Sequence, residues 1–375
     1  MFPADDPQWR VTNILSDDNQ SAWVFAFNHG IDDQQSVNIL TQDLLDYISS
    51  NNPEPVSLPL PPNVEKAICP GPPNLLTLLW SLYQIYNSIR MPKVVPRSIE
   101  EGLKTLPESF LRYTDPDQRR TICELVTLSE EATERLRRRS KEEGVTVTSA
   151  LTAAMLVINS LLLQEDSNSE FSSSLDDMTL RFLLSVGLRP FGVQSENSDD
   201  WSGGSVACAG GALDFVIRVP SEACSPLTRE FTAESNESLQ LDESFWDLAR
   251  RSQDISKFLI KVGFVPESQR LFGIGMEVVD ILKAVEIEAR NPASLGRGYT
   301  CGVSSMGVVN FRESVAAVKG VFYGTSHGRN GVLSLLSCMT VNGVFTGCLQ
   351  FPSPLIDRER AEKFKKILEK ILVEL

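Results

Sequence analysis

Residues Trp23 to Ile48 read WVFAFNHGIDDQQSVNILTQDLLDYI, and their pattern predicts a strand, a turn and a helix. The apolar run from Trp23 to Phe27 predicts a buried β-strand. A helix is predicted after it, because apolar residues recur there at helical spacing on one face: Val37, Leu40, Leu44, Leu45 and Ile48. His29 and Asp33 therefore lie where a strand ends and a helix begins, a rigidly supported position that suits a working side chain.

The chain has two histidines, His29 and His327. His29 is open to two interpretations, a hydrogen-bonded turn residue or a residue that carries chemistry. His327 is predicted to be an exposed histidine in a polar loop, because polar side chains accumulate in surface loops. A Ser-His-Asp hydrolase built on it is disfavoured, since the chain has no G-x-S-x-G elbow.

The turn Asn28-His29-Gly30-Ile31-Asp32-Asp33-Gln34 resembles the H-H-x-x-x-D-G motif of the chloramphenicol-acetyltransferase-like superfamily, which includes condensation domains and alcohol acetyltransferases. Later segments resemble further markers of that group, and they occur in the family's order over most of the chain: residues 128–163, Leu184 to Pro190 (LSVGLRP), Val303 to Gly307 (VSSMG) and Thr340 to Gln350.

The resemblance implies roles for the motif residues. His29 would be the general base, while Asp33 and Gly30 would be structural, with Asp33 orienting the turn through an ion pair to an arginine that the sequence does not identify. The sequence departs from the motif at Asn28, where the family has its first histidine, and at Gln34, where it has glycine. The second departure suggests a distorted turn or a narrowed cavity.

The fold class implied is α/β (α+β), a two-lobe sandwich of mixed sheets with flanking helices. The resemblance further implies a shortened, incomplete first lobe, because residues 1 to 22 alone precede the motif strand. We expect a partial N-terminal lobe with its linker at residues 1–114 and a C-terminal lobe at residues 115–375. An incomplete sheet leaves an unpaired edge, so an oligomer formed through that lobe is also expected.

Composition excludes several classes of function. A net charge of −14 and a pI near 4.8 argue against a nucleic-acid partner. Seven scattered cysteines with no C-x-x-C pair, and no signal peptide, indicate a reducing, cytoplasmic location and no metal site. No stretch is expected to reach the roughly 18 apolar residues of a membrane span. The apolar helix predicted at residues 75–89 is expected to be buried rather than to contact a membrane surface, since it lacks a basic face.

Outside the motif, periodicity and turn signals predict the following elements: a strand at Val11–Leu15, a linker at residues 91–118, a strand at Arg120–Leu128, a helix with Thr127 and Glu130 as its capping box and an end near Gly144, helices at Thr148–Leu163 and Ser244–Val262, strands at Thr179–Val186, Gly203–Val219 and Leu295–Asn310, strand and turn at Gly320–Gly324, a hairpin turning at Asn342-Gly343, and a C-terminal helix at Asp357–Leu375.

The function implied is transfer of an acyl group from an acyl-CoA or acyl-carrier thioester, the co-substrate, to a small-molecule alcohol or amine. A neutral imidazole suits removal of the acceptor's proton, and no further cofactor or covalent enzyme intermediate is required. By resemblance, Ser304 and Ser305 are candidates for stabilising the oxyanion or contacting substrate. The alternative is a catalytically impaired relative that serves as a binding or interaction module.

Overall fold

The computed structural model describes residues 7–16, 20–50, 120–164, 176–191, 207–232, 239–270, 280–289, 291, 294–312, 316–328 and 330–375, with seven helical positions between 75 and 86. The chain forms two compact units, each considered by itself. Unit 1 comprises the described parts of residues 1–72, 187–211 and 311–318, and unit 2 comprises those of the remainder. The predicted division between residues 114 and 115 lies outside the described residues, as does the predicted linker at 91–118.

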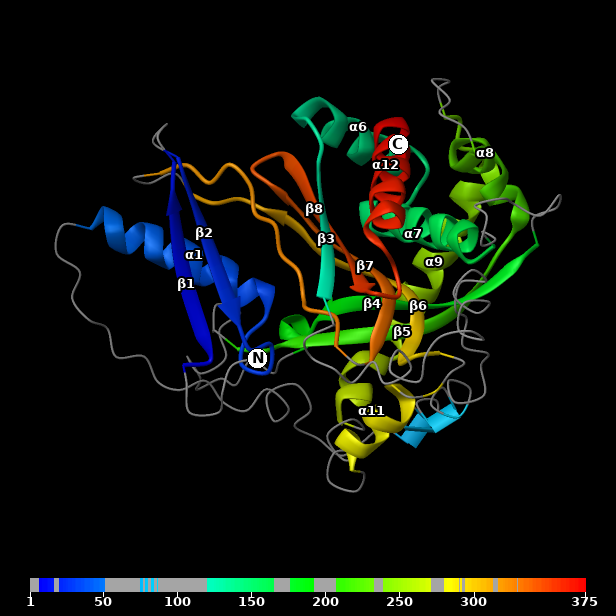
Figure 1. The fold of residues 1–375 in the computed structure, drawn as a ribbon, viewed down its shortest axis with the longest axis horizontal. Helices are drawn as coiled ribbons and strands as arrows, with labels where there is room; N and C mark the ends of the chain where they lie inside the picture. The colour runs from blue at the N-terminus through cyan, green and yellow to red at the C-terminus, as the bar shows by residue number, and fades with distance from the viewer. Residues whose placement is uncertain are drawn as a thin grey trace. The chain divides into compact units, whose positions relative to one another are not determined.

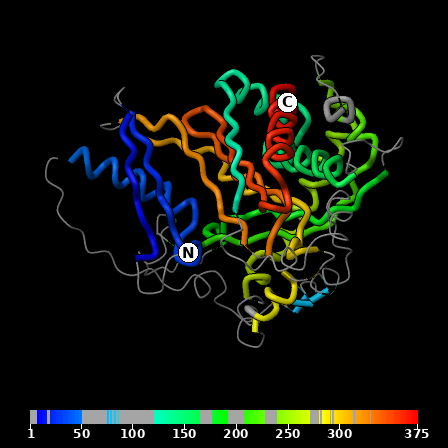
Figure 2. Tube along the Cα trace, in the orientation of Figure 1, coloured from blue at the N-terminus to red at the C-terminus, as the bar shows by residue number. Residues whose placement is uncertain are grey.

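Unit 1 is built on the predicted strand–turn–helix (Figures 1 and 2). Strand β1 (Trp9–Leu15) pairs antiparallel with β2 (Ser21–Phe27), and helix α1 (Gln34–Ser49) follows. A short 3₁₀ turn, η1 (Arg189–Phe191), belongs to the same unit, although it comes from far along the sequence.

The expected burial of β2 is wrong. Trp23, Phe25 and Phe27 are half-buried, while Val24 on the opposite face is 49% exposed. The face of β2 that carries Ala22, Val24 and Ala26 is exposed. The helix was predicted correctly, but of its five apolar residues only Leu45 is fully buried.

Unit 2 contains a six-stranded mixed sheet in the order β3-β8-β7-β6-β4-β5. Its strands are β3 (Arg120–Thr127), β4 (Met178–Gly187), β5 (Gly210–Val219), β6 (Arg297–Val309), β7 (Gly331–Val341) and β8 (Val344–Ser353). Pairing is antiparallel from β3 to β7 and parallel from β7 through β6 to β4. The mixed α/β fold class is confirmed.

Helices pack on this sheet and on one another (Figure 1). They are α6 (Glu130–Glu142), α7 (Val147–Gln164), α8 (Ser221–Thr232), α9 (Glu243–Lys261) and α12 (Arg358–Glu374). Helix α11 (Ile281–Ala289) belongs to the same unit. Helix α12 contacts β3, α6 and α7, and it buries the apolar face predicted from its periodicity. The Phe364 ring meets Phe351 of β8 edge-on, with centroids 5.1 Å apart.

Helix α7 forms the centre of the unit 2 core. It has 18 residues with a mean hydropathy of 1.6, so the expectation that no stretch reaches span length is wrong. That stretch is 89% buried inside the protein, which is typical of a core helix. Its polar Asn159 is satisfied there, since its side-chain oxygen accepts a hydrogen bond from Ser334 Oγ at 2.8 Å.

Three local predictions about turns and caps had different outcomes. The predicted capping box at Thr127 is wrong: Thr127 pairs with Thr346 in the sheet, and Ser129 is the N-cap, accepting from the Ala132 N–H at 3.1 Å. Gly144 does follow the end of α6, with φ +71°. The Asn342-Gly343 hairpin is confirmed, with both residues at positive φ.

Two predicted segments remain to be accounted for. The segment predicted as strand and turn at Gly320–Gly324 is irregular, and it lies against the sheet through a hydrogen bond from Thr346 Oγ1 to the Val321 carbonyl. The helix predicted at residues 75–89 lies largely outside the described residues.

Candidate active site

The turn between β2 and α1 is held by short-range hydrogen bonds. The Gly30 N–H donates to Asn28 Oδ1 at 3.0 Å, and the Ile31 N–H donates to the Asn28 carbonyl at 3.0 Å. Asn28 Nδ2 in turn donates to Gln8 Oε1 at 2.8 Å. A Cβ on Gly30 would make an ordinary van der Waals contact with Asn28 Oδ1, at 3.4 Å. The asparagine that replaces the motif's first histidine therefore shapes the turn that carries His29.

One nitrogen of the His29 ring has a fixed partner within this turn. Nδ1 lies 2.8 Å from the Asp32 carbonyl oxygen, which can only accept a hydrogen bond. In the neutral ring the proton is therefore on Nδ1, and Nε2 is the nitrogen that can take a proton from another molecule. His29 as a residue is exposed, so small molecules can reach it.

The pKa of His29 is raised to about 9. The largest cause is a hydrogen bond with the Cys208 side chain; the Asp32 carbonyl and the Asp33 charge act in the same direction, and partial desolvation of the ring opposes them. The imidazole is therefore held largely protonated at neutral pH for as long as Cys208 is its partner. Cys208 carried no signal in the sequence, where it was one of several isolated cysteines.

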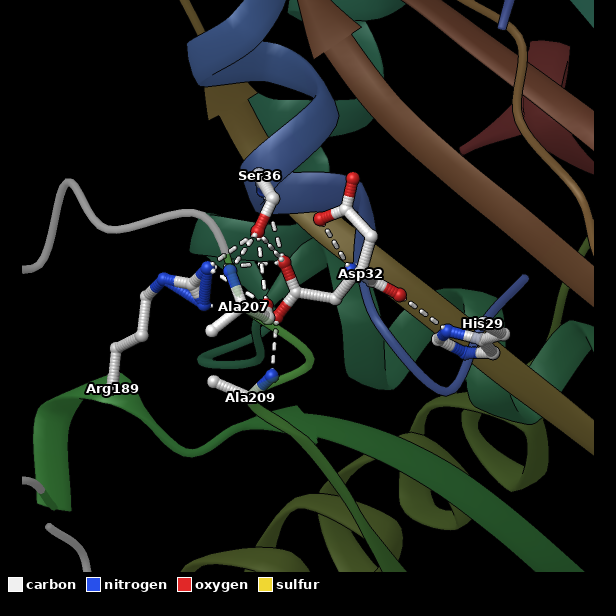
Figure 3. Close-up of polar contacts among 7 residues, drawn as sticks. His29, Asp32, Ser36, Arg189, Ala207 and Ala209 are labelled. Carbon is white, nitrogen blue, oxygen red and sulfur yellow. Dashed lines mark hydrogen bonds and ion pairs between the residues drawn. The ribbon is translucent and has the colours of Figure 1, made fainter. Parts of the chain in front are cut away.

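Asp33 is the N-cap of α1 and the centre of a hydrogen-bond cluster (Figure 3). Its Oδ1 accepts from the Ser36 N–H at 2.9 Å and from Ser36 Oγ at 3.0 Å. Arg189 binds both carboxylate oxygens, from Nη1 to Oδ2 at 2.9 Å and from Nη2 to Oδ1 at 3.1 Å. Arg189 is thus the partner that the sequence could not identify, although it stands in the Leu188-Arg189-Pro190 marker.

The same cluster fixes residues 207–209. The Ala209 N–H donates to Asp33 Oδ2 at 2.9 Å, and the Ala207 N–H lies 2.9 Å from Ser36 Oγ. Arg189 Nη2 also donates to the Ala207 carbonyl at 3.2 Å. Figure 3 shows Ser36, Arg189, Ala207 and Ala209 converging at the start of α1, with His29 to one side beside the Asp32 carbonyl. Cys208 is held between two residues whose backbones are both tied to α1.

Asp32 is the remaining acidic residue of the turn. It is 4% exposed, its Oδ1 accepts from the Asp33 N–H at 2.9 Å, and burial raises the pKa of its carboxyl. Its side chain supports the turn, while its carbonyl orients His29.

Ser304 and Ser305 lie on β6 in unit 2, and their hydrogen-bond partners belong to that unit. The Tyr323 hydroxyl donates to the Ser304 carbonyl at 2.5 Å and lies 3.2 Å from Ser304 Oγ. Thr148 Oγ1 donates to Ser305 Oγ at 3.2 Å. The two serines therefore belong to a hydroxyl cluster near the start of α7, and their predicted role stays a prediction.

The expectation of an exposed His327 is wrong. The residue is in a loop, but its backbone N–H donates to Thr121 Oγ1 at 2.8 Å, and its ring is largely enclosed. Burial, followed by the charge of Arg297, lowers the pKa of His327 to about 4. His327 is thus a neutral, structural histidine. Nowhere in the described part of the chain do three or more metal-ligating side chains come together.

The fold matches solved acyltransferases and condensation domains. The trichothecene 15-O-acetyltransferase TRI3 from Fusarium sporotrichioides aligns with 98% of this chain and 71% of its own, at a TM-score of 0.62 and 13% identity. The condensation domain of the monacolin K polyketide synthase MokA aligns at 0.55 and 12% identity, over 98% of this chain and 72% of its own. The chain has a chloramphenicol-acetyltransferase-like fold.

Polyketide synthase associated protein 5 from Mycobacterium tuberculosis shares this fold at a TM-score of 0.51 and 13% identity, over 99% of this chain and 78% of its own. No family model and no curated protein sequence matches the chain. At these identities the likeness is one of fold. This chain spans about seven-tenths of the length of each of the first two relatives named.

Proposed function

We propose that the chain transfers an acyl group from an acyl-CoA or acyl-carrier thioester to the hydroxyl or amino group of a small molecule, with His29 taking the acceptor's proton. The carrying observation is the hydrogen bond from His29 Nδ1 to the Asp32 carbonyl. In the neutral form of the ring, which a pKa of about 9 makes the minor form at neutral pH, this bond leaves Nε2 as the proton acceptor. The fold supports the same class of reaction, since relatives that share it are an acetyltransferase and a condensation domain.

The Asp33 cluster supports this role indirectly. Asp33 and Arg189 fix the start of α1, and so the turn that presents the imidazole. A base must be positioned closely to act in a transition state, and a turn locked at its end provides that. Ser304 and Ser305 remain candidates for the oxyanion contact on the resemblance of their segment to the family's marker alone.

A second candidate, a binding or interaction module that keeps the fold without the activity, is favoured by one observation. Asn28 and Gln34 replace the first histidine and the glycine of the motif, and in this structure Asn28 serves to hold the turn. A module of this kind would bind an acyl thioester or an acceptor without turning it over.

The test is release of CoA from acetyl-CoA and octanoyl-CoA in the presence of a panel of alcohols and amines, measured by chromatography. His29→Ala is expected to lower turnover by roughly 10²- to 10⁴-fold. The matched control variant is His327→Gln, which removes the chain's other histidine and is expected to keep turnover. Turnover that survives His29→Ala would overturn the proposed role, and binding of acyl-CoA without any turnover would favour the module.

A further inference from the structure

Asn28 joins the start of the motif turn to the first strand of the hairpin. Its backbone N–H donates to the Gln8 carbonyl at 2.8 Å, and its side-chain Nδ2 donates to Gln8 Oε1 at 2.8 Å. Gln8 directly precedes β1, and Trp9 beside it pairs with Phe27, the last residue of β2. The backbone bond therefore continues the ladder of the hairpin by one step, and the side-chain bond adds a second contact at the same place.

Asn28 also accepts two hydrogen bonds from the turn itself. The Gly30 N–H donates to its side-chain Oδ1 at 3.0 Å, and the Ile31 N–H donates to its carbonyl at 3.0 Å. A backbone N–H can only donate, so the contact with Gly30 fixes which end of the Asn28 amide is oxygen. The other end, Nδ2, then donates to Gln8. One asparagine therefore satisfies a donor in the turn and an acceptor beside the strand at the same time.

The turn that carries His29 is thus held at both ends. Asn28 holds its start, and Asp33, bound to Arg189, holds its end. Between them the Asp32 carbonyl lies 2.8 Å from His29 Nδ1. Asn28 and His29 are exposed residues, so the turn depends on these hydrogen bonds for its shape more than on burial.

Gln34, the other departure from the motif, has its side chain directed along α1. It is the first residue of the helix, and its Nε2 donates to Asn38 Oδ1 at 3.0 Å, four residues further on. Asp33, directly before it, keeps its hydrogen bonds with Ser36 as the N-cap. The helix therefore begins in the ordinary way with glutamine at this position.

We propose that Asn28 and Gln8 are positioning residues for the acyl transfer, which take the place of the motif's first histidine and hold the turn so that His29 presents Nε2. This inference rests on the proposed function and adds two residues to it. Asn28 is then a substitution that works, not the loss that would mark a binding module. An amide does not titrate, so Asn28 keeps its acceptor whether or not the neighbouring His29 is protonated, whereas an imidazole there would lose it on protonation.

The deciding variant restores the motif. In Asn28→His the neutral imidazole can accept from the Gly30 N–H, but it has no N–H in the place of Nδ2 to bind Gln8. Turnover of acetyl-CoA or octanoyl-CoA with a productive acceptor is expected to fall about threefold, the effect of one exposed hydrogen bond. Turnover above the wild-type rate would overturn the proposal, because it would show that asparagine at this position is a loss of function.

Asn28→Ala removes both side-chain hydrogen bonds. We expect kcat to fall about tenfold, a modest effect because water replaces part of each bond at an exposed residue. KM should not change, because Asn28 positions the base and does not contact substrate. Gln8→Ala removes the outer bond alone and should lower kcat about threefold. The matched control is Asn13→Ala, an exposed asparagine within β1, which is expected to keep kcat; thermal unfolding checks that every variant is folded.

Asn28→Asp tests whether the hydrogen bonds are what matters. One carboxylate oxygen can accept from the Gly30 N–H, and the other can accept from Gln8 Nε2 once the Gln8 amide turns over. The highest kcat reached across the pH profile is expected to stay within about twofold of wild type. The new negative charge beside His29 raises the pKa of the imidazole, so the profile should move to higher pH. A highest kcat as low as that of Asn28→Ala would overturn the proposal.

A further measurement does not depend on turnover. NMR of the chain with ¹⁵N-labelled histidine, at about pH 10, reads the tautomer of His29 where a pKa of about 9 leaves the ring mostly neutral. Wild type is expected to carry the proton on Nδ1, bound to the Asp32 carbonyl, and Asn28→Ala is expected to show a mixture of both tautomers. The same tautomer in the two proteins would overturn the proposal.

The outcomes separate this inference from the proposed function. An unchanged kcat in Asn28→Ala, in a protein whose turnover His29→Ala abolishes, overturns the inference and leaves His29 standing as the base. A change of tautomer in Asn28→Ala, in a protein that shows no turnover even as wild type, supports the positioning of His29 and removes the transferase.

Discussion

Replacing Asp33 with alanine removes the centre of the cluster at the start of α1. The carboxylate accepts five hydrogen bonds, three of them from Ser36 and Ala209 and two from Arg189. The carboxylate and the guanidinium are 12% and 11% exposed, so water cannot fully take the place of the missing partner. We expect Asp33→Ala to destabilise unit 1 strongly.

The magnitude follows from the kind of interaction lost. Removing one member of a buried, bidentate ion pair costs roughly 3–5 kcal/mol, because the other charge stays buried without its carboxylate. The lost N-cap, worth about 1 kcal/mol by itself, is part of the same change. A decrease of about 4 kcal/mol in the free energy of opening of unit 1 corresponds to roughly a thousandfold increase in the population of its open, unfolded state. Asp33→Asn keeps the shape of the cap without its charge, so an intermediate loss is expected.

Hydrogen exchange followed by mass spectrometry measures the loss of stability separately in each unit. Peptides from α1 (Gln34–Ser49) should lose protection, whereas peptides from α7 (Val147–Gln164) in unit 2 should not. The matched control is Asp46→Ala on the same helix, where the ion pair with Arg312 is 43% and 73% exposed. Exposed pairs contribute about 0–1 kcal/mol, so a small effect is expected there.

A loss below about 1 kcal/mol in Asp33→Ala, or one equal to that in Asp46→Ala, would refute the reasoning. It would mean that the bidentate pair contributes no more than a surface contact.

Three further predictions follow from the structure. The chain has two histidines, so NMR can follow the pKa of each one separately. His29 should titrate near pH 9 in wild type and closer to its ordinary 6.5 in Cys208→Ala, while the pKa of His327 should not change. A His29 pKa that is the same in both proteins would show that Cys208 does not raise it. Folding lowers the pKa of His327 from 6.5 to about 4, so the folded state binds fewer protons than the unfolded state between these pH values. The free energy of unfolding should therefore fall as pH drops from 6.5 to 4, and it should fall less in His327→Gln. Urea unfolding at several pH values measures this, and the same dependence on pH in the two proteins would disprove it. Phe364→Ala should destabilise unit 2 by about 3–5 kcal/mol in urea unfolding, because the side chain is 1% exposed and its ring packs on Phe351. A decrease in the free energy of unfolding below about 1 kcal/mol would show that the core collapses around the gap.

The pattern of neighbouring residues correctly predicted a helix, a hairpin and the strand–turn–helix around His29. Helix α12 and the Asn342-Gly343 hairpin were predictable because a one-faced periodicity and a turn that requires positive φ are properties of neighbouring residues. The strand–turn–helix around His29 was predictable for the same reason. The burial of β2 was not predictable, because it depends on which other segments cover each face of the strand. A run of apolar residues does not contain that information.

The sequence by itself determined where His29 and Asp33 lie and that they share one turn. The tertiary structure alone decided what each of them contacts. Asp33 meets Arg189 across 156 positions of sequence, and His29 meets Cys208, a cysteine with no distinguishing neighbours in the chain. His327 became a largely enclosed, neutral residue in the same way. Contacts of this kind arise when distant segments pack together, so the pKa of a histidine depends on neighbours that its own stretch of sequence does not contain.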